Sequence, residues 1–203
     1  MTKSNALMLL IFSLVLLWSG IHPHDGFTWV LEVAPAILGV LVLLATGRRF
    51  RFSSFAYWVM LLHAVVLMVG GHYTYAEVPL FDWLREPMGW SRNNYDKVGH
   101  FMQGFAPAVV TRELLWRLDV VRKRGWLAFL TVCVCMAISA VYELIEWLVA
   151  VLSRQAADAF LGTQGYVWDT QSDMLWCLIG AISMLLPFGR LHQHAMAKIA
   201  QSH

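Results

Sequence analysis

The sequence has 203 residues, of which 59% are hydrophobic and 14% are charged, and its mean hydropathy is +0.58. Soluble domains are less apolar and about one quarter charged, so this composition excludes an ordinary soluble domain. The net charge is only +2, and the basic residues stand in short groups between apolar segments, so we predict no nucleic-acid partner. Residues 1–203 are expected to form a single multi-pass membrane domain.

Six apolar segments are long enough, or nearly long enough, to cross a bilayer as helices. A hydrocarbon core about 30 Å thick requires about 20 helical residues. We therefore predict an all-α fold, a polytopic membrane bundle of about six transmembrane helices, with the lipid bilayer as its immediate partner. The predicted spans cover residues 6–21, 28–46, 55–71, 98–118, 126–152 and 173–189. No small-x-small cleavage pattern follows the first segment, so we expect it to be retained.

The charged residues segregate between the two sides of this arrangement. With the N-terminus inside, 11 of the 15 basic residues fall in inner segments and 11 of the 13 acidic residues in outer ones. Basic loops tend to stay in the cytoplasm, so the sequence predicts that both termini are cytoplasmic. The inner basic residues are Lys3, Arg48, Arg49, Arg51, Arg112, Arg117, Arg122, Lys123, Arg124, Arg190 and Lys198.

Ionisable residues recur at the outer ends of the last three predicted spans. Their i, i+3 and i, i+4 spacings place the members of each group on one helical face. Similar depth on three helices predicts that the groups converge. They are Asp96, His100 and Gln103 in the fourth span, Glu143 and Glu146 in the fifth, and Asp169 and Asp173 at the start of the sixth.

Glu143 and Glu146 require an explanation, because they lie three residues apart in an otherwise apolar segment. Ionisable side chains within a membrane usually face a partner, a cavity or an ion path, since exposure to lipid costs a few kcal/mol each. The two carboxyl groups could bind a metal cation, share protons, or pair with Lys97, Arg92 or Arg154. They could also lie in the headgroup zone, satisfied by water and basic residues without any further role.

A metal is one candidate cofactor, because oxygen ligands with one histidine suit Mn, Fe, Mg or Zn better than a soft ion. No Glu-x-x-His motif occurs, so a ferritin-like di-iron bundle is not expected. The candidate metal ligands are Glu143, Glu146, Asp169, Asp173 and His100. The candidate catalytic residues are Asp96, His100, Glu143, Glu146 and Asp173. The candidate substrate-binding residues are Arg92, Lys97, Gln103 and Gln164.

Other polar residues receive simpler interpretations. Arg112 and Glu113 lie near the inner end of the fourth span, where a long basic side chain reaches the interface and local pairing satisfies the acid. His192 is assigned to a C-terminal tail.

Three sequence blocks, "NNYDKVGHFMQGFAPA", "AVYELIEW" and "FLGTQGYVWDTQSDM", resemble the YjdF family of bacterial inner-membrane proteins. The resemblance covers nearly the whole chain and implies a multi-pass protein of the bacterial inner (plasma) membrane. The family is one of unknown function, so it implies no reaction, cofactor or substrate. The chain is also distantly similar to VanZ-like proteins through an Asp-x-x-x-His element, which Asp96 and His100 match.

Three functional hypotheses follow. In the first, an outward-facing site, metal-dependent or not, acts on a lipid or envelope precursor. In the second, the same acids serve a proton- or cation-coupled transporter, although no inverted repeat supports this. In the third, the protein is a noncatalytic envelope factor whose polar cluster packs helices together. Whether it is an enzyme, its substrate and its oligomeric state stay open at this level.

Overall fold

The computed structural model describes residues 3–152 and 163–200, and all regular structure in these ranges is helical. The predicted all-α fold is therefore confirmed. The helices are α1 (Lys3–Ser19), α2 (Gly26–Thr46), α3 (Ser54–Tyr73), the 3-10 turn η1 (Tyr75–Glu77), α4 (Pro79–Arg85), α5 (Tyr95–Arg117), α6 (Arg124–Leu152), α8 (Asp169–Leu185) and α9 (Gly189–Ala200).

The six predicted spans correspond to α1, α2, α3, α5, α6 and α8. By length and apolarity, α2, α3 and α6 could each cross a membrane alone, and α8 with α9 could form a fourth span bent by 58°. The helix α1 is apolar but has only 17 residues. The 23-residue α5 is long enough but carries charged residues at both ends, of which Asp96 and Glu113 are buried inside the bundle. The predicted number of six is thus approximate.

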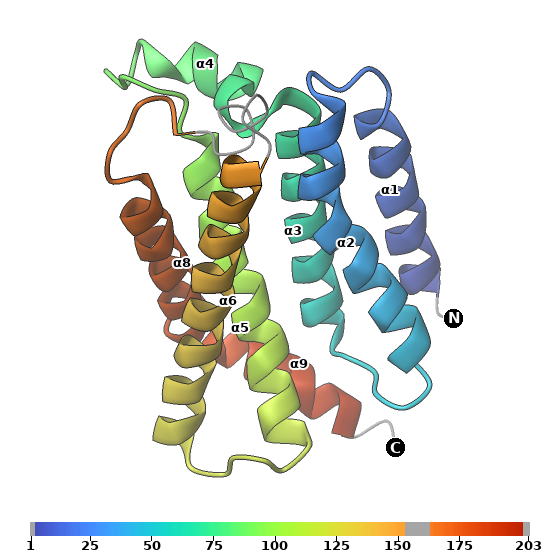
Figure 1. Ribbon diagram of the computed structural model, residues 1–203. Helices are drawn as coiled ribbons and strands as arrows, with labels where there is room; N and C mark the ends of the chain where they lie inside the picture. The colour runs from blue at the N-terminus through green and yellow to red at the C-terminus, as the bar shows by residue number, and fades with distance from the viewer. Residues whose placement is uncertain (1–2, 153–162, 201–203) are drawn as a thin grey trace.

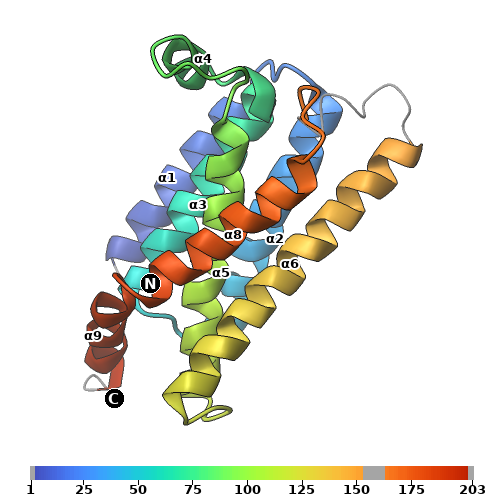
Figure 2. The same ribbon diagram turned by 90° about the vertical axis from the view of Figure 1, so that its left-hand side faces the viewer.

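Two groups of three helices make up the bundle (Figure 1). The helices α1, α2 and α3 lie on one side and α5, α6 and α8 on the other, and α3 packs against α5 to join them. In the turned view, α6 lies along one edge of the bundle (Figure 2). We call the end that carries α4 the outer end, and the end that carries α9 the inner end.

Side-chain caps define where two of the helices begin. At the outer end, the Asp25 carboxylate accepts a 2.6 Å hydrogen bond from the Thr28 backbone N–H at the start of α2. This bond holds the pKa of Asp25 below its usual value. At the inner end, Ser53 caps α3 by accepting from the Ala56 N–H. Both residue types are favoured caps, because their oxygens satisfy donors left free in the first turn.

The helices α5 and α8 cross with their backbones in direct contact. A Cβ atom added to Gly104 of α5 would overlap the carbonyl oxygen of Cys177, and one added to Gly180 of α8 would overlap that of Phe101. Small residues permit such close packing in membranes, where van der Waals contact is a main source of helix association. The pair of glycines therefore fixes how closely α5 and α8 approach.

A polar cluster at the inner end of the bundle is centred on Glu113, which is fully buried. Its carboxylate accepts hydrogen bonds from the Ser53 backbone and hydroxyl (both 2.7 Å), from Arg117 (2.6 Å) and from His192 Nε2 (3.1 Å). The other ring nitrogen of His192 lies 2.9 Å from Arg112 Nη1, so the ring accepts from Arg112 and donates to Glu113. The assignment of His192 to a tail is therefore wrong: the residue lies in α9, and its hydrogen bonds hold α9 against α5.

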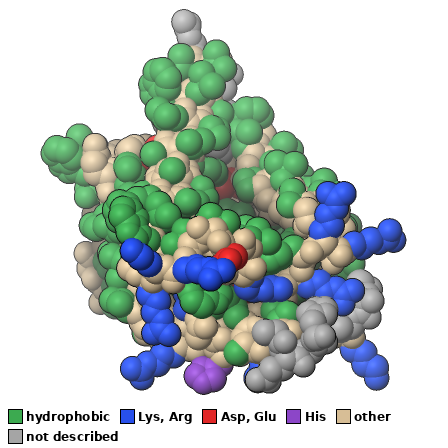
Figure 3. All heavy atoms as spheres, turned by 90° about the horizontal axis from the view of Figure 1, so that it is seen from below, with side chains coloured by type: hydrophobic (Ala, Val, Ile, Leu, Met, Phe, Trp, Pro, Cys, Tyr) green, Lys and Arg blue, Asp and Glu red, His purple; other side chains and the backbone are tan. Residues whose placement is uncertain are grey.

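Basic side chains gather on the inner face of the molecule (Figure 3). They come from the α2–α3 loop, the α5–α6 loop and α9, the positions predicted from the sequence. The charged groups on this face of the folded chain are therefore predominantly basic.

We expect Gly104→Ala to destabilise the protein by about 2 kcal/mol or more, because the added methyl group forces α5 and α8 apart. Thermal unfolding of purified protein in detergent would measure this. Gly39→Ala is the matched control, since nothing lies within 4 Å of a Cβ atom at this position in α2. The control should keep or slightly raise the melting temperature. Equal effects of the two substitutions would contradict this view of the crossing.

Candidate functional site

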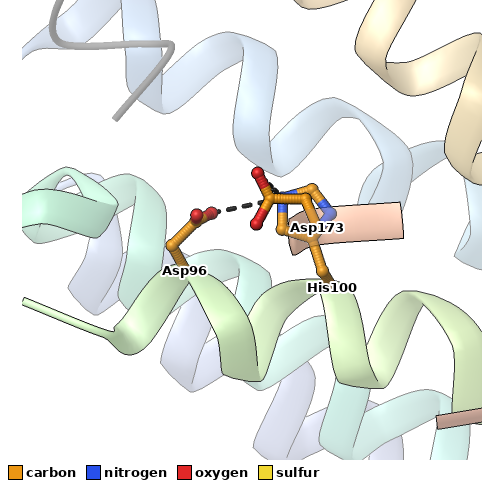
Figure 4. Close-up of side chains that lie close together, drawn as sticks. All are labelled: Asp96, His100 and Asp173. Carbon is orange, nitrogen blue, oxygen red and sulfur yellow. Dashed lines mark ion pairs between the residues drawn. The ribbon is translucent and has the colours of Figure 1, made fainter. Parts of the chain in front are cut away.

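Residues from α5 and α8 form the centre of the outer polar cluster. Asp96 and His100 lie one turn apart on α5 and point toward Asp173 on α8 (Figure 4). His100 Nε2 lies 3.2 Å from Asp96 Oδ1 and 3.9 Å from Asp173 Oδ2. One donor atom from each residue lies within 4.8 Å of the others. The structure thus brings these three residues together, as their spacing in the sequence predicts.

Gln103 determines how the imidazole of His100 is presented. Its Oε1 lies 3.2 Å from His100 Nδ1, as expected if the ring donates its Nδ1–H to the amide oxygen. This tautomer leaves the lone pair of Nε2 directed at Asp96 and Asp173. Metal-binding histidines commonly hold their second ring nitrogen in this way. Gln103 thus contacts a candidate ligand, and its predicted role in substrate binding stays a prediction.

The helix α6 adds Glu143 and Glu146 to the cluster. Both face the interior and are no more than 9% exposed. Glu143 Oε1 lies 3.9 Å from His100 Nδ1, and Glu146 is near enough to His100 and Glu143 to interact electrostatically. Oε1 of Glu143 and Oδ1 of Asp173 are buried without a hydrogen-bond partner among the described residues. Burying such atoms without a partner is costly, so these oxygens are available to a ligand.

Arg92 pairs with two acids of the cluster, Asp96 and Asp169. It forms ion pairs with Asp169 and, at 3.1 Å, with Asp96 Oδ2, and it also donates to the backbone oxygen of Thr163. The guanidinium is buried together with both carboxylates. Asp169, predicted as a metal ligand, is therefore an ion-pair partner of Arg92 in this structure. Arg92 holds α5, α8 and the loop before α8 together, and its predicted role in substrate binding stays a prediction.

The remaining predicted residues lie at the edge of the cluster or outside it. Gln164 is exposed, and its side-chain amide both donates to and accepts from the backbone of Asn93, at 2.9 Å each. Lys97 is half-buried, and the structure gives it no ion pair with a described carboxylate. Arg154, one of the basic partners considered for Glu143 and Glu146, lies outside the described residues.

Glu32 on α2 is a member of the cluster that the sequence patterns did not include. It is 3% exposed and accepts a 3.1 Å hydrogen bond from the hydroxyl of Tyr142 on α6. The Tyr75 hydroxyl also hydrogen-bonds to it, and the Tyr75 ring is held between α3 and α5 where Gly70 and Gly99 leave room. Tyr142 also contacts His100 edge to face, with ring centroids 6.4 Å apart. Tyr142 thus lies between His100 and Glu32, with a ring contact to the first and a hydrogen bond to the second.

The cluster contains more acidic than basic groups. Among the described residues it has six buried carboxyl groups, and the basic groups beside them are the guanidinium of Arg92 and the imidazole of His100, which carries a charge only when both of its nitrogens are protonated. Several unneutralised carboxylates could not be buried together without large desolvation and repulsion costs. Protons or a bound cation must therefore compensate. The six are Glu32, Asp96, Glu143, Glu146, Asp169 and Asp173.

The fold and this buried cluster define a multi-pass helical membrane protein. The chain belongs to the DUF2238 family, described as predicted membrane proteins, whose family profile matches residues 4–194. It is similar to the Inner membrane protein YjdF of Escherichia coli (strain K12), with 52% identity over 183 residues, covering 90% of this chain and 88% of that protein. The predicted resemblance to the YjdF family is confirmed. No solved structure matches the chain.

We expect Arg92→Gln to destabilise the protein by about 3 kcal/mol, because it leaves Asp96 and Asp169 buried without their cation. Adding Asp169→Asn should restore part of the loss, since one of the two uncompensated charges is then removed. The measurement is thermal unfolding in detergent.

The control is Arg122→Gln, which breaks an equally close ion pair with Asp119 on the exposed surface. It should leave the melting temperature unchanged, because exposed pairs contribute little. If the double variant were no more stable than Arg92→Gln alone, the ion pair with Asp169 would not explain the burial of Arg92.

Proposed function

We propose that the outer cluster is a divalent-cation site, and that the protein uses the bound cation to act on a lipid or envelope precursor. One observation carries this proposal. Asp96, His100 and Asp173 present donor atoms to a common point in a buried cluster that has too few positive charges for its carboxyl groups. A divalent cation would supply the missing charge and use the two unpartnered oxygens of Glu143 and Asp173.

The donor distances suit a small metal ion. Ligands about 2.1 Å from a metal lie about 3 Å apart when adjacent and about 4 Å when opposite. The separations of His100 Nε2 from Asp96 and Asp173, at 3.2 and 3.9 Å, fall in this range. Carboxylates with one imidazole favour Mn, Fe, Mg or Zn. Asp96, His100 and Asp173 are the ligands we propose, with Glu143 and Glu146 nearby as bases or additional ligands.

We infer that the protein lies in the bacterial inner membrane with both termini in the cytoplasm. The name of the relative in Escherichia coli supports the membrane, and the basic inner face supports the orientation (Figure 3). In this orientation the cation site lies toward the periplasmic surface, at the depth of the outer-leaflet headgroups. Phospholipids and lipid-linked precursors carry phosphate there, and a bound cation can polarise a phosphoryl oxygen or activate water.

A proton- or cation-coupled carrier is the alternative that a specific observation favours. His100, Tyr142 and Glu32 lie next to one another across the two helix groups, joined by a ring contact and one hydrogen bond. Buried chains of carboxyl and imidazole groups are typical of proton relays. In this reading the carboxyl groups share protons instead of holding a metal. A noncatalytic envelope factor is the third possibility, in which removing the cluster affects folding alone.

We expect the wild-type protein, purified without chelator, to contain about one equivalent of a divalent metal by elemental analysis. Asp173→Asn should lower its metal affinity at least about tenfold, because a charged ligand is lost. Asp119→Asn is the matched control, since it makes the same change on the exposed inner loop. It should bind metal as the wild type does.

Chelation separates the proposal from its alternatives. If the cation stabilises the fold, chelator should lower the melting temperature of the wild type and leave that of Asp173→Asn unchanged. A metal-free wild type with an unchanged melting temperature would support proton sharing and exclude the metal site.

The orientation predicts that a fluorescent protein fused to the C-terminus folds in the cytoplasm and fluoresces. A C-terminal alkaline phosphatase fusion should be inactive, because that enzyme requires the periplasm to form its disulfides. A phosphatase fusion inserted after Gly89, in the loop between α4 and α5 at the outer end, should be active and serves as the control. The opposite pattern would place the cation site on the cytoplasmic side.

A further inference from the structure

A shallow hollow lies on the surface of α6 at its inner end. It has a volume of about 330 Å³ and is lined by Gly125, Trp126 and Phe129. The two aromatic rings meet edge to face, with centroids 5.7 Å apart, and their residues are 58% and 57% exposed. Nothing lies within 4 Å of a Cβ atom placed on Gly125, so the glycine keeps the hollow open. The surface of the hollow is apolar and exposed on the side of the bundle.

Basic residues adjoin the hollow at the start of α6. Lys123 and Arg124 are both exposed, and the structure gives their side chains no ion pair or hydrogen bond with any residue in the described ranges. Arg122 differs, because Asp119 already neutralises it. Arg124 also lies close enough to Arg112 of α5 for the two cations to repel each other. An anion at this position would relieve that repulsion.

We propose that the hollow binds one anionic phospholipid, with its phosphate at Lys123 and Arg124 and an acyl chain against Trp126 and Phe129. The order of the groups along α6 carries the assignment. Cations stand at the helix start, aromatic rings follow within the first two turns, and apolar residues continue toward the membrane centre. A lipid has the same order from headgroup to chain. Tryptophan is common at headgroup depth, and basic pockets beside membrane helices bind acidic headgroups.

A ligand of this surface has to use both its cations and its aromatic rings, and a lipid can do so. A free phosphate ion would use the cations but not the exposed aromatic rings. A neutral phospholipid would use the rings but leave the excess positive charge uncompensated. An anionic phospholipid satisfies both. The proposal is independent of the cation site, which lies at the opposite end of the bundle.

Short-chain lipids test the proposal on the purified protein in detergent, with bound lipid counted by native mass spectrometry. Dioctanoyl phosphatidylglycerol should bind with saturation at one site, and dioctanoyl phosphatidylcholine should bind at least about tenfold more weakly. The double substitution Lys123→Gln with Arg124→Gln should weaken phosphatidylglycerol binding roughly thirtyfold, since each cation near a membrane surface contributes about fivefold.

Two further variants distinguish a built site from a generally basic surface. Arg48→Gln with Arg49→Gln removes two exposed cations from the same inner face and should leave binding within about twofold of the wild type. Gly125→Leu fills the hollow while keeping every charge, and should weaken binding severalfold without a change in melting temperature.

Three results would overturn the proposal. One is an equal loss in the Arg48 and Arg49 control, which would indicate attraction to the whole face. Another is wild-type binding by Gly125→Leu, which would show that the hollow is not used. The third is full competition by millimolar inorganic phosphate, which would reduce the site to one for a simple anion.

Discussion

The direct contact between the backbones of α5 and α8 is the constraint on which the candidate site depends. Gly104 and Gly180 allow the two helices to touch, and Asp173 reaches His100 only because they do. Any side chain larger than hydrogen at either position would move a carboxylate away from the imidazole. Helix association, usually discussed as a matter of stability, here sets the distances among charged groups one to two turns away.

Periodicity in the sequence was enough to predict much of this arrangement. Asp96 and His100 share a face of α5 because they are four residues apart, and Asp169 and Asp173 share a face because α8 begins at Asp169. The side of each helix that carries acids could be derived from spacing alone, and the basic loops indicated which ends lie together. Local geometry determines all of these features, so a single sequence is sufficient to reveal them.

Contacts between distant segments could not be predicted in the same way. Glu32 and Tyr142 are 110 residues apart, and Glu113 and His192 are 79 apart, so no helical period links them. Arg92 was predicted to bind substrate, or to pair with Glu143 and Glu146. Its pairing with Asp169 depends on how the loop before α8 returns to α5. The contact of Gln164 could not be predicted for the same reason, because its amide hydrogen-bonds to the backbone of Asn93, 71 residues away.

The buried cluster around Glu113 has a consequence for how the chain is assembled. Ser53 and Arg117 are available as soon as α5 is made, whereas His192 follows Glu113 by 79 residues and is synthesised later. Until α9 docks, the carboxylate of Glu113 lacks one of its donors. Docking supplies that donor through His192 Nε2 and brings Arg112 to the other nitrogen of the same ring. The helix α9 therefore completes a cluster that the preceding helices leave one donor short.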